Sequence, residues 1–189
     1  MSKHIAFLSA VAFGALAITA SVVAPVSAQD KMMSGKKTVM VGGAAMFPSK
    51  NIIQNAVNSK DHTTLVAAVK AAGLVETLEG KGPFTVFAPT NAAFAKLRAG
   101  TVDTLVKPEN KATLTKILTY HVVPGRLEAS DLTDGKKLRT VQGEELTVKR
   151  SGNKIMIIDA KGGSSTITIE NVNQSNGVIQ VIDTVLMPS

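Results

Sequence analysis

Residues 83–94 read Pro83-Phe84-Thr85-Val86-Phe87-Ala88-Pro89-Thr90-Asn91-Ala92-Ala93-Phe94. The first part, 84–88, is apolar on both faces except at Thr85, which is typical of a central strand that is covered on both sides. Pro89 ends the strand, and Thr90 is placed as a helix N-cap. Pro89 and Phe94 occupy the N′ and N4 positions of a hydrophobic staple. The stretch therefore predicts a buried strand that leads directly into a helix.

The chain before this stretch has helical periodicity. Residues 51–58 and 63–72 place apolar side chains on one face, and Gly73 is positioned to end the second helix. A short continuation follows over 74–78. After the stretch, a further helix is expected from about Pro108 to Tyr120.

The second half of the chain changes to strand-like segments rich in Val, Ile and Thr. These are expected at 138–141, 145–150, 154–159, 166–172 and 178–186, with turn residues between them. Ser151-Gly152-Asn153 and Asn176-Gly177 indicate hairpins. Helices followed by antiparallel strands predict an α+β domain, with N-terminal helices packed on a twisted antiparallel sheet. We expect one such domain over residues 51–189.

The first 28 residues have the composition of a signal peptide. Lys3 precedes an apolar run over 5–24, and Val26-Ser27-Ala28 offers the small residues that a signal peptidase accepts. An uncleaved membrane anchor is the alternative. Residues 29–50 are interpreted as a flexible leader. We therefore expect a secreted or periplasmic protein with no membrane span after cleavage.

The charge pattern argues against binding to nucleic acid. The formal net charge is +7, but much of the excess lies before the expected domain, at Lys31, Lys36, Lys37 and Lys50. Beyond the signal peptide the chain keeps few aromatic side chains that could stack on bases. Weak attraction to anionic cell surfaces fits this composition better.

Three separated motifs resemble the fasciclin family. These are the 83–94 stretch, Thr119-Tyr120-His121-Val122-Val123-Pro124-Gly125, and the closing segment 176–188, which begins Asn176-Gly177-Val178. They occur in the family's order and spacing, and the resemblance covers residues 51–188. It implies an α+β fold with a sheet wedge flanked by helices. It also implies adhesion through a cell-surface or matrix protein or a glycan, although a fold alone does not define a partner.

The resemblance also singles out candidate site residues. Tyr120 and His121 fall in a segment that the family links to partner binding. The alternative is structural, since a histidine between a helix and a strand can hydrogen-bond to nearby loop groups, and we favour it. The remaining signature residues are assigned structural roles: Phe84, Phe87, Pro89, Thr90, Phe94 and Asp183. Asp183 is expected to bond to backbone amides or to a hydroxyl near Thr90.

No pattern in the sequence indicates an enzyme. There are no cysteines, no His-x-x-x-His pair, no Gly-x-Ser-x-Gly motif and no phosphate-binding glycine-rich loop. We therefore expect no catalytic residues, no metal and no cofactor. Two functions stay open: a non-catalytic adhesion or protein-interaction module, and a periplasmic or secreted carrier of a small apolar ligand or envelope stress factor. The oligomeric state stays undefined.

Overall fold

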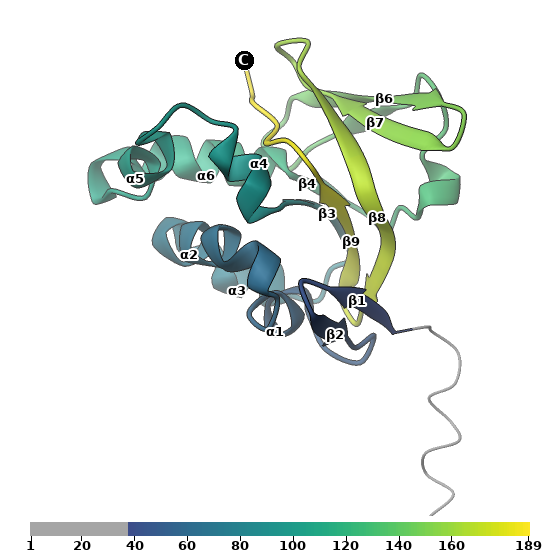
Figure 1. Ribbon diagram of the computed structural model, residues 1–189, viewed down its shortest axis with the longest axis horizontal. Helices are drawn as coiled ribbons and strands as arrows, with labels where there is room; N and C mark the ends of the chain where they lie inside the picture. Colours follow the sequence, from purple (N-terminus) through teal and green to yellow (C-terminus); the bar gives the residue numbers. More distant parts are fainter. Residues whose placement is uncertain (1–37) are drawn as a thin grey trace, which may run out of the picture. The chain divides into compact units, whose positions relative to one another are not determined.

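The computed structural model describes residues 38–189, which form an α+β domain (Figure 1). Its α-helices in chain order are α1 (Ile52–Ala56), α2 (Thr63–Ala72), α3 (Val75–Glu79), α4 (Asn91–Ala95), α5 (Thr101–Leu105) and α6 (Lys111–Tyr120). Its strands are β1 (Val39–Val41), β2 (Ala44–Met46), β3 (Phe84–Pro89), β4 (Val122–Pro124), β5 (Lys137–Arg139), β6 (Glu145–Ser151), β7 (Lys154–Ile158), β8 (Ser164–Gln174) and β9 (Gly177–Ile182). Short 3-10 turns lie at η1 (Lys60–His62), η2 (Pro108–Asn110) and η3 (Ala129–Asp131). The predicted fold class is confirmed.

The main sheet of the described chain has the strand order β4-β3-β9-β8-β7-β6-β5. Its neighbours pair antiparallel except for β3 and β9, which run parallel in register from Phe84↔Gly177 to Pro89↔Ile182. The sheet is therefore mixed, whereas the sequence predicted an antiparallel one. A Cβ at Gly177 would clash with the Phe84 carbonyl, so this close start of the parallel pair requires glycine.

The central strand β3 separates two hydrophobic cores. Val86 and Ala88 pack toward the helices, together with side chains of α2 and α6. Phe87 points to the other side, where it joins Tyr120 and apolar residues of β6, β7 and β8. Figure 1 shows the helices gathered on one side of β3 and β9, and the β6–β7 hairpin on the other. Burial on both faces explains the almost continuous apolar run of β3.

The structure differs from the sequence prediction at residues 38–50. The sequence indicated a flexible leader there, but β1 and β2 form a hairpin whose Val41 and Met46 are buried in the core beside α1. Strands of three residues joined by Gly42-Gly43 are too short to show periodicity, so sequence reasoning started the domain too late. The signal-peptide prediction and residues 29–37 lie outside the described residues.

Candidate functional site

The junction between β3 and α4 is held by Thr90. Its side-chain oxygen accepts a hydrogen bond from the Ala93 amide at 3.2 Å, and its own amide donates to the Ile182 carbonyl at 3.3 Å. The first bond caps α4, and the second ties the junction to β9. Phe87 and Phe94 are buried on opposite sides of this junction. These signature residues therefore connect the two cores.

Tyr120 lies at the C-terminal end of α6 and is fully buried. Its hydroxyl donates to the Glu145 carbonyl at 3.3 Å and accepts from the Ala160 amide at 2.8 Å. Burial raises the pKa of this phenol, the Ala160 amide opposes that shift, and the nearby carboxylates of Asp159 and Glu144 add to it. The side chain joins α6 to the first residue of β6 and to the segment after β7.

His121 follows directly and is only 2% exposed. Its Nδ1 lies 2.8 Å from the Ile117 carbonyl, and its Nε2 accepts from the Leu186 amide at 3.0 Å. Because an amide can only donate and a carbonyl can only accept, these partners require the neutral tautomer with the proton on Nδ1. Burial lowers the pKa of His121 to about 4, against the opposing effects of the Ile117 carbonyl and Asp159. The ring is thus neutral at pH 7 and links α6 to the C-terminal segment.

Asp183 comes directly after β9. It accepts from the Thr166 amide at 2.9 Å and from the Thr184 hydroxyl at 3.0 Å, and it lies 3.7 Å from Lys96 Nζ. Partial burial acts to raise the pKa of this carboxyl, but the Thr166 amide, the Thr184 hydroxyl and Lys96 outweigh it, so the pKa is lowered. The carboxylate links the end of β9 to β8 through the backbone amide of Thr166.

His62 is a second buried histidine, which the motifs in the sequence did not single out. It is 3% exposed, and its Nδ1 lies 2.9 Å from the Ser59 hydroxyl. Its Nε2 is the one buried side-chain polar atom within residues 38–189 that has no hydrogen-bond partner. Burial lowers the pKa of His62, while the nearby Ala88 carbonyl and Asp61 carboxylate oppose that shift without pairing Nε2.

Both histidines line an apolar cavity of about 40 Å³ between the helices and β3. The other lining residues come from the β1–β2 hairpin, α1, α2, α3, α6 and the central strands. Across the described residues no group of three or more His, Asp or Glu side chains is arranged to hold a metal ion. In the same part of the chain, no helix is long and apolar enough to cross a bilayer.

Comparison with known proteins defines the family. The fasciclin domain model matches residues 60–188, which is most of the chain. The chain belongs to the fasciclin family. The matched region begins at Lys60, so the β1–β2 hairpin and α1 precede it.

Several relatives of this fasciclin protein are bacterial. The chain is 46% identical to Protein sll1483 of a Synechocystis strain, over 87% of this chain and 88% of that protein. It is 40% identical to Immunogenic protein MPB70 of Mycobacterium bovis, over 70% of this chain and 66% of the relative. It is also 40% identical to Cell surface glycolipoprotein MPB83 of the same species, over 78% of this chain and 64% of that protein.

A solved structure of a FAS1 domain pair from the insect cell adhesion molecule fasciclin I has the same fold. The TM-score is 0.67 at 18% identity, over 75% of this chain and 52% of that chain. At this identity the likeness concerns the fold alone.

The two motif residues that the family links to partner binding do not lie on the surface. Tyr120 and His121 are both buried, and every polar atom of their side chains is bonded within the domain. This favours the structural interpretation of His121 over direct contact with a partner.

Proposed function

We propose that this fasciclin protein is a non-catalytic binding module that works outside the cytoplasm, where it adheres to a cell-surface or matrix protein or a glycan. The observation that supports this most is family membership, together with a relative named as a cell surface glycolipoprotein. The signal-peptide-like first 28 residues agree with such a location.

In this proposal Tyr120 and His121 act on binding indirectly. Both side chains are buried, so they position β4 and its exposed last residue, Pro124, and the partner contacts exposed residues. Tyr120 and His121 thus hold the backbone in place and do not themselves contact the partner.

The test is binding of the labelled, exported protein to the producer's own cells and to surfaces coated with matrix proteins or glycans. Saturable binding that a heat-denatured sample lacks would support the proposal. A His121→Ala variant, assayed at a temperature where circular dichroism confirms that it is folded, would keep part of the binding if the residue acts through position. Absence of saturable binding on every surface would refute the proposal.

A carrier of a small apolar ligand is the second candidate, and the cavity beside His62 is the observation that favours it. The lining is apolar, and Nε2 of His62 offers one unpaired polar atom. Ligand pockets usually measure roughly 300–1,000 Å³, whereas this cavity is about 40 Å³. A ligand of ordinary size would therefore need the hairpin or α1 to move, which makes this candidate the weaker one.

Native mass spectrometry of freshly purified protein separates the two candidates. A stoichiometric extra mass that denaturation releases would favour the carrier. A clean apo mass, with saturable surface binding, would favour adhesion.

A further inference from the structure

The β1–β2 hairpin is apolar on both of its faces. Val41 and Met46 point inward and are buried, whereas Met40, opposite Ala45, points outward and is 60% exposed. Phe47, two residues beyond Ala45, is 44% exposed. A hairpin that covers a core normally carries polar residues on its outer face. We call the outer side chains of Met40, Ala45 and Phe47 the hairpin face.

Exposed apolar residues cluster in this part of the chain. In the described residues, large hydrophobic side chains that are exposed occur at Met40, Phe47, Val57 and Val141. Three of these four precede the region that the fasciclin model matches. The hairpin face therefore lies before the region that the family model matches.

The backbone beneath the hairpin face is fixed. The side chain of Asn55 accepts from the Phe47 amide at 3.0 Å and donates to the Phe47 carbonyl at 2.8 Å. The side-chain amide of Asn55 also donates to the side-chain oxygen of Gln174, and both Asn55 and Gln174 are fully buried. At the other end of the hairpin, the Gly42 carbonyl accepts from the Lys60 amide at 3.3 Å. A surface that is already ordered loses little conformational entropy when it binds.

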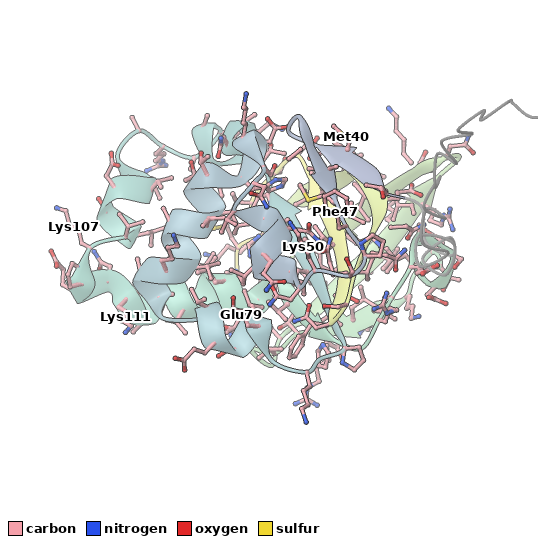
Figure 2. All side chains as sticks on the ribbon, turned by 90° about the horizontal axis from the view of Figure 1, so that it is seen from below. Met40, Phe47, Lys50, Glu79, Lys107 and Lys111 are labelled. Carbon is pink, nitrogen blue, oxygen red and sulfur yellow. The ribbon has the colours of Figure 1, made fainter. Side chains whose placement is uncertain are left out.

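A lysine lies beside the hairpin face. Lys50 Nζ lies 5.2 Å from the centroid of the Phe47 ring, and Figure 2 shows Met40, Phe47 and Lys50 in the same part of the molecule. Between residues 38 and 60 the chain carries Lys50 and Lys60 and no acidic residue, and Asp61 is the first carboxylate that follows. In sequence, Lys36 and Lys37 stand directly before this segment.

We propose that the hairpin face docks onto a membrane surface that carries anionic lipid headgroups. Apolar side chains that stand out of a fixed hairpin suit the boundary between headgroups and acyl chains, and the adjacent lysines suit lipid phosphates. Met40 and Phe47 are displayed outward and lie outside the cavity lining, so a flat layer fits the face better than a projecting ligand. This inference rests on the proposed function, since it names one kind of surface that the module binds.

The experiment is co-sedimentation of the exported, purified protein with phosphatidylcholine vesicles that contain or lack phosphatidylglycerol. We expect binding to the anionic vesicles that weakens as salt is added. The double variant Met40→Ser/Phe47→Ser should bind at least about tenfold more weakly than the unchanged protein. The variant Lys50→Glu should lose at least as much affinity.

Two matched control variants change residues in the second half of the chain. Val141 is 46% exposed, so Val141→Ser removes a similar exposed apolar group, and Lys154→Glu reverses an exposed charge on β7. Both should bind like the unchanged protein. Because all the altered side chains are exposed, circular dichroism and the urea midpoint should stay unchanged in every variant.

Several results would overturn the lipid proposal. These are no binding to either vesicle, equal binding to both, or equal losses in the Val141→Ser control. Sedimentation equilibrium tests whether a second copy of the chain binds the hairpin face instead. A dimer that the double variant Met40→Ser/Phe47→Ser dissociates would assign the face to that second copy. If vesicles fail while saturable binding to cells persists, the lipid inference falls and the proposed function stands.

Discussion

The two buried histidines differ in how their rings are hydrogen-bonded. His121 and His62 are 2% and 3% exposed, so burial does not distinguish them. His121 bonds through both nitrogens to backbone groups of α6 and of the C-terminal segment, 65 residues further along the chain. His62 bonds through one nitrogen to Ser59, three residues away, and leaves Nε2 unpaired. The His121 ring therefore holds distant segments together, whereas the His62 ring makes only a local contact.

The largest expected effect is that of His121→Ala. The change leaves the Ile117 carbonyl and the Leu186 amide buried without partners, each at a cost of about 1–3 kcal/mol. We expect the free energy of unfolding to fall by about 3 kcal/mol or more, measured by urea denaturation followed by circular dichroism. A loss below about 1 kcal/mol would show that the ring does not link α6 to the C-terminal segment.

Acidification should also lower the free energy of unfolding, by somewhat less than His121→Ala does. The pKa of His121 is about 4 in the fold against an ordinary value of 6.5, so between these pH values the unfolded chain binds a proton that the folded chain does not. Stability is therefore full above pH 6.5 and falls as the pH decreases toward 4. We expect about 2 kcal/mol to be lost between pH 7 and pH 5.

The lowered pKa of His62 adds to the acid loss with the same sign. Asp183 and Glu144, whose pKa values are lowered from the ordinary values of 3.8 and 4.5, contribute mainly below pH 5. Urea unfolding at a series of pH values checks this prediction. A free energy of unfolding that is flat between pH 7 and pH 5 would contradict a neutral, buried His121.

Ser59→Ala tests the single hydrogen bond of the His62 ring. Ser59 is buried, and its hydroxyl is the hydrogen-bond partner of the His62 ring. Its removal leaves both ring nitrogens unpaired, so we expect a loss of about 1–2 kcal/mol. Thermal unfolding detects this change. The double variant Ser59→Ala/His62→Leu should recover part of the loss, and if it adds to the loss, the hydroxyl acts through some other contact.

The smallest effect is expected for His62→Leu. The substitution removes a polar ring that is only half satisfied and places an aliphatic side chain against an apolar cavity. The buried Ser59 hydroxyl loses its partner, but the unpaired Nε2 is removed at the same time, so we expect the free energy of unfolding to fall by no more than about 1 kcal/mol. If this variant proves as unstable as His121→Ala, the unpaired Nε2 has a partner in solution, such as an ordered water.

Local sequence signals determined much of the fold. Thr63–Ala72 forms a helix that ends at Gly73, which adopts the left-handed conformation with φ 72°. The β6–β7 hairpin turns between Ser151 and Lys154, as the Ser151-Gly152-Asn153 signal predicted. These features depend on backbone preferences and side-chain alternation within a few residues, so a single sequence contains the information.

Other features could not be found locally. The helix α5 has only five residues, so Val102 and Leu105, which are partly buried against the core, make too short a pattern to detect. Asn176 was predicted only as a turn residue. Its side chain also accepts from the Ile52 amide and donates to the Leu78 and Gly80 carbonyls, about a hundred residues away. Such long-range partners have no periodic signature.

The family, the α+β class and the β3–α4 junction could be predicted from the amino-acid sequence, because the motif residues and the local rules for strands, caps and turns agree. The folded structure was needed to show that β3 and β9 run parallel, that the hairpin belongs to the domain, and that Tyr120 and His121 face inward. The physical reason is that pairing direction and burial depend on segments far apart in the chain. The free energy of those contacts is a property of the packed whole.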